Sequence, residues 1–98
     1  MKGYVYIRVN RKNGAIYTGF TKDLHARLLE HKNKVDPKSF TARYDVTTLV
    51  YLEVYDLVAD AIAREKQVKN WKRKWKIALW EESNPHWAEL QLDWRDLE

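Results

Sequence analysis

The 98-residue sequence has no cysteine, only three glycines and two prolines, and no long hydrophobic run. The absence of cysteine excludes disulfides, thiol nucleophiles and cysteine-ligated zinc, and it fits a reducing compartment such as the cytoplasm. Because no apolar stretch approaches the roughly 18 residues of a membrane-spanning helix, we expect no membrane association. With 45% hydrophobic residues and so little glycine and proline, the composition describes one packed domain rather than a disordered chain.

Aromatic residues and unevenly placed charges are what the sequence has in excess. Five tryptophans contribute to an aromatic content of 13%. Residues 1–43 contain ten lysines and arginines against three acids, whereas residues 44–98 contain eight against eleven, seven of the eight within 64–76. A basic surface with interleaved aromatics favours a polyanionic partner, most simply nucleic acid. The same composition also describes the solvated surface of a small soluble protein.

Three segments are expected to form an antiparallel sheet. Apolar and polar residues alternate over 4–9 and again over 15–20, and the intervening Asn13-Gly14 is typical of a hairpin turn. Residues 47–55 are rich in β-branched and aromatic side chains, which indicates a third strand.

Three helices are expected around these strands, the first before the third strand and two after it. Thr21 is a suitable cap for the first helix and Asp56 for the second. The element order β-β-α-β-α-α predicts an α+β fold, a small three-stranded antiparallel sheet flanked by helices. The expected helices cover 21–34, 57–71 and 73–82, followed by a closing element over 86–90 that completes a domain of residues 1–90, and by an acidic tail over 91–98.

A two-residue turn at Asn13-Gly14 would place Tyr17 opposite Asn10 in the hairpin. Alternation then gives one apolar core face and a second face rich in tyrosine. A glycine within a strand often marks the close approach of a ligand, although tyrosines also favour strands and the glycine is otherwise a bulge. The tyrosine-rich face comprises Tyr4, Tyr6, Arg8, Tyr17 and Gly19.

Polar side chains also lie on helix stripes that are otherwise apolar. Arg27 and His31 are four residues apart and share one side of the first helix, where they either approach the tyrosine face or lie at the core edge and reach solvent. Glu65 falls within the apolar stripe of the second helix, where a carboxylate needs a cation. That cation is either a metal ion or Lys69, four residues on.

The basic segment 64–76 suits phosphate contacts, and it is equally compatible with a solvated helix. Its two tryptophans, Trp71 and Trp75, are spaced to pack together, and we expect them in the core rather than on a base-stacking surface. The histidines lack the spacing of a zinc site.

Together these residues resemble the GIY-YIG nuclease family over nearly the whole chain, from Tyr4 to about Leu90. Tyr4-Val5-Tyr6 stands where the family has Gly-Ile-Tyr, and Tyr17-Thr18-Gly19 where it has Tyr-Ile-Gly, so Tyr4 and Thr18 are the two departures. The remaining matches are the helix arginine and its companion, Arg27 and His31, the metal-binding glutamate, Glu65, and the closing asparagine motif, Asn84-Pro85-His86-Trp87.

The resemblance implies a metal-dependent endonuclease that hydrolyses phosphodiester bonds, in DNA more than in RNA, with a role in DNA repair or processing. Glu65 would hold one Mg²⁺ or Mn²⁺, in keeping with the preference of Mg²⁺ for a carboxylate, waters and phosphate. Tyr6 or Tyr17 would take a proton from water, helped by the positive charge of Arg27, and His31 would assist proton transfer. Substrate contacts would come from Gly19, Lys69, Lys72, Arg73 and Asn84.

Two other functions remain open from the sequence. One is a nucleic-acid-binding module that keeps the fold without catalysis. The other is a protein-interaction domain that uses the tryptophan-rich C-terminal part. The sequence leaves open the substrate shape, the oligomeric state and the choice between the two tyrosines.

Overall fold

The computed structural model describes residues 1–32 and 43–92 of the chain. In this part of the chain the predicted order β-β-α-β-α-α and the three-stranded antiparallel sheet are both confirmed. None of the described helices combines the length and the apolar character needed to cross a membrane. The elements are β1 (Gly3–Val9), β2 (Ile16–Thr21), α1 (Leu24–Lys32), β3 (Thr48–Tyr55), α3 (Val58–Lys69) and α4 (Arg73–Ala78).

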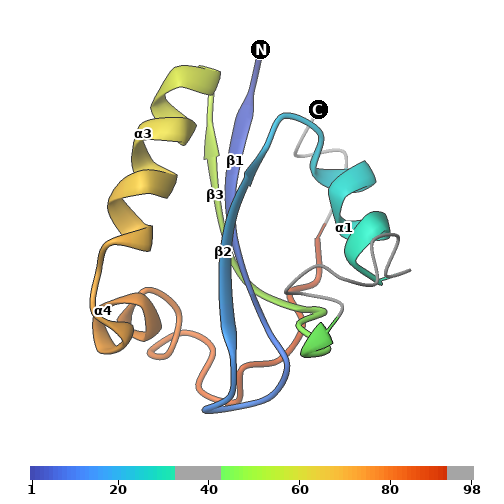
Figure 1. The fold of residues 1–98 in the computed structure, drawn as a ribbon, viewed down its shortest axis with the longest axis vertical. Coiled ribbons are helices and arrows are strands. Elements are labelled where there is room, and N and C mark those ends of the chain that lie inside the picture. Colours follow the sequence, from blue (N-terminus) through green and yellow to red (C-terminus); the bar gives the residue numbers. More distant parts are fainter. Residues whose placement is uncertain (33–42, 93–98) are drawn as a thin grey trace.

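Strand β1 lies at the centre of the sheet, in the order β2-β1-β3. All seven of its residues are buried. Figure 1 shows the reason: α3 and α4 lie on one side of the sheet and α1 lies on the other. The tyrosine-rich face is therefore a second core, not an open surface.

Each sheet face has its own hydrophobic core. On one face, Ile7 and Val9 pack with Val68 of α3 and with Trp80 and Trp87. The residues of the other core are Tyr4, Tyr6, Leu24, Leu28 and Leu49, with Tyr17, Leu52, Leu90 and Leu92 packed against them. Because Leu24 and Leu28 belong to α1, the first helix covers the tyrosine-rich face.

The hairpin register differs from the predicted one by two residues. Tyr17 lies opposite Arg8, not Asn10. The loop contains four residues, 11–14, because Asn10 N–H donates to the Ala15 carbonyl at 3.3 Å. A shift by two preserves the side-chain alternation, so the predicted faces are correct although the predicted partners are wrong.

Two predicted helix caps are wrong. The side chain of Asp23, rather than that of Thr21, accepts a hydrogen bond from the first turn of α1, from Ala26 N–H at 3.2 Å. Helix α3 begins after Leu57, which makes no side-chain capping bond, and not after Asp56. The α1 boundary predicted at residue 34 lies outside the described residues.

The C-terminal part is less regular than predicted. Helix α4 ends at Ala78, and residues 84–92 have no regular secondary structure. This segment nevertheless closes both cores: Trp87 is buried on the α3 side, and Leu90 N–H donates to the Leu49 carbonyl at 2.8 Å. Figure 1 shows it crossing below the sheet towards the side of α1.

Close packing between β1 and α3 gives a test of the layered fold. A Cβ atom at Gly3 would lie 2.6 Å from the Ala61 Cβ. We expect Gly3→Ala to lower the free energy of unfolding by about 1–3 kcal/mol, because α3 must move away from the sheet. Urea denaturation of Gly3→Ala, Ala61→Gly and the double variant measures this effect. The double variant should lose less than the two single losses combined, and simple additivity would show that this contact does not limit the packing.

Candidate functional site

Two tyrosines from adjacent strands form the centre of the candidate site. Tyr6 of β1 is fully buried, and Tyr17 of β2 is half-buried. Their ring centroids are 6.1 Å apart and their planes are inclined by 44°. Both rings lie on the sheet face that α1 covers.

Gly19 lies directly opposite Tyr6 and makes room for its ring. The two residues are regular cross-strand partners, so Gly19 is not a bulge. A Cβ atom at Gly19 would lie 2.6 Å from Tyr6 Oη and 2.8 Å from Tyr17 Cε1. The glycine is therefore required by the tyrosine pair itself rather than by a ligand or a bulge.

The surroundings of Tyr6 keep its hydroxyl protonated. Burial raises the pKa of Tyr6, and so do the proximity of Tyr17 and a hydrogen bond with it. The positive charges of Arg27 and Arg8 act in the opposite direction but are outweighed, so the pKa lies well above the ordinary value of a phenol. Tyr6 therefore supplies very little phenolate at neutral pH.

The tyrosine cluster includes Arg27. No described contact joins Glu65 to it. Arg27 of α1 is half-buried, and its positive charge is near enough to Tyr6 to oppose part of the rise in the pKa of Tyr6. The backbone of His31 belongs to α1, but its side chain lies outside the described residues. The structure therefore brings together Tyr6, Tyr17, Gly19 and Arg27.

Glu65 lies in the opposite helix layer and is paired with Lys69. It occupies the α3 stripe that includes the buried Ala61 and Val68, and its side chain is 14% exposed. Lys69 Nζ lies 2.8 Å from Glu65 Oε1, which confirms the ion pair that the spacing offered. The two halves of the predicted site thus approach the sheet from different faces.

A single carboxylate can still serve one divalent metal ion. Among the side chains that the structure describes, in residues 1–29 and 43–92, no group of three histidines, aspartates or glutamates is arranged to hold a metal. Mg²⁺ commonly binds one carboxylate and completes its shell with waters and phosphate oxygens, so Glu65 fits as a lone protein ligand. Lys69, with 51% of its side chain exposed, has room to leave the carboxylate.

The other predicted substrate contacts have different surroundings. Lys72 is exposed at the start of α4, and Arg73 Nη2 donates a hydrogen bond to the Gly14 carbonyl in the hairpin loop. The Asn84 amide is used within its own turn, since Nδ2 donates to the Ala88 carbonyl at 2.9 Å and Oδ1 accepts from Ala88 N–H at 3.0 Å.

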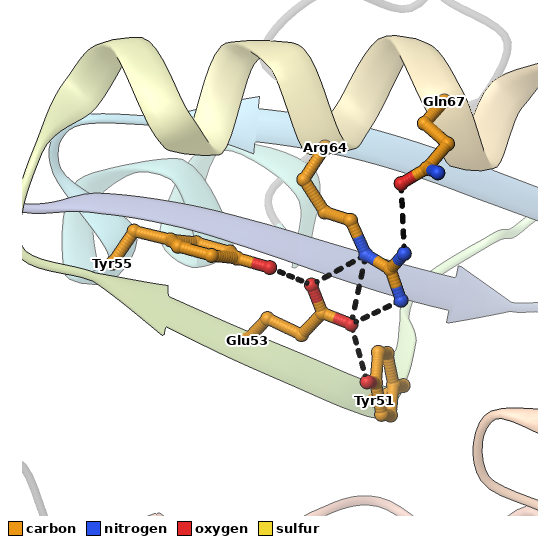
Figure 2. Close-up of polar contacts among 5 residues, drawn as sticks. All are labelled: Tyr51, Glu53, Tyr55, Arg64 and Gln67. Carbon is orange, nitrogen blue, oxygen red and sulfur yellow. Dashed lines mark hydrogen bonds and ion pairs between the residues drawn. The ribbon is translucent and has the colours of Figure 1, made fainter.

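Sequence reasoning missed a polar network between β3 and α3, shown in Figure 2. Arg64 Nε lies 3.0 Å from Glu53 Oε1, and the hydroxyls of Tyr51 and Tyr55 donate to the same carboxylate at 2.5 and 2.7 Å. Arg64 also donates to Gln67 at 2.9 Å. The alternation Tyr-x-Glu-x-Tyr in the third strand was the available signal, because it places three polar side chains on one sheet face.

This network sets the charge state of Glu53. Burial by itself raises the pKa of Glu53, but the hydrogen bonds from Arg64, Tyr51 and Tyr55 outweigh it and hold that pKa below its ordinary value. The folded protein thus binds the Glu53 proton more weakly than the unfolded chain does. Glu53 therefore stabilises the fold above its unfolded pKa, and this contribution is lost as the pH falls through the folded value.

Replacement of Glu53 tests the network. We expect Glu53→Gln to lower the free energy of unfolding at pH 7 by about 1–3 kcal/mol, since Arg64 loses its buried partner. The difference from the wild type should shrink on acidification below about pH 4, where the carboxylate becomes protonated. Urea denaturation at several pH values measures it, with the exposed Glu82→Gln as control. A difference that is independent of pH would contradict the assignment.

Replacement of Gly19 tests the tyrosine cluster. Gly19→Ala should displace the Tyr6 or Tyr17 ring and lower the free energy of unfolding by about 1–3 kcal/mol, with a changed near-ultraviolet circular dichroism spectrum. Thr18→Val is the matched control, because the buried Thr18 hydroxyl has no hydrogen-bond partner and faces the other side of the strand. If the two variants have equal stabilities and spectra, Gly19 is not required by the rings.

Comparison with known proteins places the chain in a family. A family model described as the GIY-YIG catalytic domain matches residues 2–78. A UPF0213 protein of Staphylococcus saprophyticus is 38% identical over 78 residues, which cover 80% of this chain and 93% of the relative. A UPF0213 protein of Staphylococcus epidermidis is 37% identical over 81 residues, 83% of this chain and 96% of the relative.

The solution NMR structure of a UPF0213 protein from Bacillus halodurans is also similar, with 32% identity, a TM-score of 0.49, and coverage of 81% of this chain and 82% of that one. The family model spans most of the chain, from Lys2 to Ala78, and includes every strand and helix of the described fold. The chain therefore belongs to the GIY-YIG family, whose members are generally endonucleases that use divalent metals.

Proposed function

We propose that this protein is a metal-dependent endonuclease that hydrolyses phosphodiester bonds in DNA. The observation that carries the proposal is the cluster of Tyr6, Tyr17, Gly19 and Arg27. This cluster brings two phenols and a guanidinium together. The two rings lie so close to Gly19 that no side chain would fit at that position. Because the chain belongs to a nuclease family, we interpret this cluster as a site for phosphodiester hydrolysis.

The two tyrosines have different roles in this proposal. Tyr6 is fully buried and stays protonated, so it positions its neighbour through their hydrogen bond. Tyr17 is half-buried and lies on an edge strand, so it is the phenol that water can reach, and we assign to it the proton transfer from the attacking water. Arg27 supplies positive charge for the attacked phosphate.

Glu65 would hold the metal ion, Mg²⁺ or Mn²⁺. The bound metal would supply positive charge for the phosphate and the leaving oxygen. Strand β2 carries Tyr17 and Gly19 on one face and contacts α3 on the other. The proposal therefore requires that the nucleic acid cross this edge of the sheet to meet both layers. Lys69, released from Glu65, would then contact the nucleic acid together with Lys72. His31 remains a candidate for proton transfer, whereas Asn84 is assigned to its turn.

One observation favours the alternative of a nucleic-acid-binding module without catalysis. Glu65 is neutralised by Lys69, and no described contact joins it to the tyrosine cluster. If this pair is permanent, the protein holds no metal and only the basic surface acts. The two functions differ in metal-dependent cleavage, while both predict salt-sensitive binding of nucleic acid.

A nicking assay on supercoiled plasmid tests the proposal. With Mg²⁺ or Mn²⁺ we expect the wild type to nick, and we expect Glu65→Gln and Tyr17→Phe each to lower the rate by about 100-fold or more, because a metal ligand and a proton acceptor are lost. The matched controls are Glu82→Gln and Tyr44→Phe, which change an exposed carboxylate and an exposed phenol elsewhere.

The control variants should nick as fast as the wild type. If Glu65→Gln is equally fast, a contaminating nuclease explains the signal. If the wild type binds DNA but leaves plasmid, flapped, branched and single-stranded substrates intact with both metals, the protein is the binding module.

A further inference from the structure

One tryptophan is exposed in the most basic part of the chain. Trp75 of α4 is 52% exposed, although Trp80 and Trp87 are almost completely buried. The expectation that both Trp71 and Trp75 belong to the core is therefore correct only for Trp71, which is partly buried against the α3-side core. A large apolar side chain left in solvent is a candidate contact for a ligand.

Trp75 is held in place without being covered. Its ring meets that of Trp71 edge to face, with centroids 6.5 Å apart and an interplanar angle of 79°. The guanidinium of Arg64 lies 4.8 Å from the Trp71 ring centroid. Arg64 is itself fixed by Glu53, as Figure 2 shows. The Figure 2 network therefore supports Trp71, and Trp71 supports Trp75.

An apolar hollow lies beside the two rings. Its lining is Trp71, Trp75, Ala78 and Leu79, and it is open to solvent. A flat, hydrophobic hollow next to an aromatic ring accepts another flat ring by stacking, and every nucleic-acid base offers such a surface.

The basic residues of α3 and α4 near Trp75 indicate the class of ligand for this hollow. Four of the seven residues from Lys72 to Ala78 are basic, and two further cations lie in the last turn of α3. The cores of protein–protein interfaces are depleted in lysine, whereas sites for single-stranded nucleic acid combine aromatic rings with cations that follow the phosphates. The cations are Lys66, Lys69, Lys72, Arg73, Lys74 and Lys76.

We propose that this hollow, the Trp75 site, binds an unpaired base of single-stranded DNA, stacked on Trp75 with its phosphates on the lysines of α3 and α4. The inference rests on the proposed nucleic-acid substrate, but it does not require cleavage. It assigns to the protein a preference for DNA with an unpaired strand, such as a flap or an overhang. Because the base is unpaired, its face is available for stacking, which a base inside a duplex cannot offer.

Binding without metal separates this site from the nuclease centre. Fluorescence anisotropy with a labelled oligothymidine and a duplex of equal length, in the presence of a chelator, measures affinity for each form. We expect Trp75→Ala to weaken binding of the single strand about tenfold and to leave the duplex affinity unchanged. Trp75→Phe, which keeps a ring, should recover most of the affinity.

Two further variants complete the design. Tyr44→Ala removes an aromatic side chain of similar exposure elsewhere and should have no effect on either DNA. Lys74→Gln should weaken binding of both forms and reduce the salt dependence, whereas Trp75→Ala should leave the salt dependence as it is. Circular dichroism confirms that each variant is folded.

Three outcomes would overturn the inference. They are an unchanged single-strand affinity in Trp75→Ala, an equal loss for both forms, and a wild-type self-association that Trp75→Ala abolishes, which would make the hollow a protein interface. The nuclease proposal is tested separately: stacking can fail while metal-dependent nicking persists, and nicking can fail while the single-strand preference persists.

Discussion

The burial of β1 on both faces is the constraint on which the rest of the structure depends. A strand with seven buried residues needs a helix layer on each side, and α1 and α3 provide the two layers. Polar groups on this strand therefore depend on partners inside the protein rather than on water. Arg8 is fully buried and donates to the carbonyls of Val46 and Thr47, so it joins the central strand to the residues just before β3. Burial lowers the pKa of Arg8, and nearby Glu89 from the C-terminal segment opposes that shift.

The same constraint gives the tyrosine pair its chemistry. Tyr6 occupies a buried position on a central strand, so its hydroxyl is removed from water and its pKa rises. Tyr17 is on the neighbouring edge strand β2, which pairs with another strand along only one of its two edges, and Tyr17 remains half-buried. Two residues of the same type thus differ in burial because of their positions in the sheet, and this difference depends on tertiary packing that the sequence pattern does not specify.

Side-chain periodicity predicted the elements and the sheet faces, because alternation and helical spacing are local properties. It did not predict the hairpin partners, which depend on whether the loop has two or four residues. Asn13, with a φ of 62°, fits a four-residue loop as well as a two-residue turn. Periodicity did not separate Trp75 from Trp80 either. Trp75 lies within the basic helix α4 and Trp80 follows that helix, and only tertiary packing decides which of the two is buried. The Glu53–Arg64 contact joins residues 11 apart on two elements, and no local pattern specifies such a pair.

In the proposed enzyme, the functional groups are distributed between the two helix layers, one on each face of the sheet. The α1 side holds the phenols and Arg27, and the α3 side holds Glu65, the lysines and Trp75. Strand β2 is an edge strand that contacts α3, so the proposed enzyme requires a nucleic acid that crosses this edge to meet both sets of groups. The Glu65–Lys69 pair keeps a nearly buried carboxylate neutralised. In the proposed enzyme a metal ion would take the place of Lys69 beside Glu65, and a substrate phosphate would become the partner of Lys69. On this view substrate and metal bind together, each removing the cost of the other.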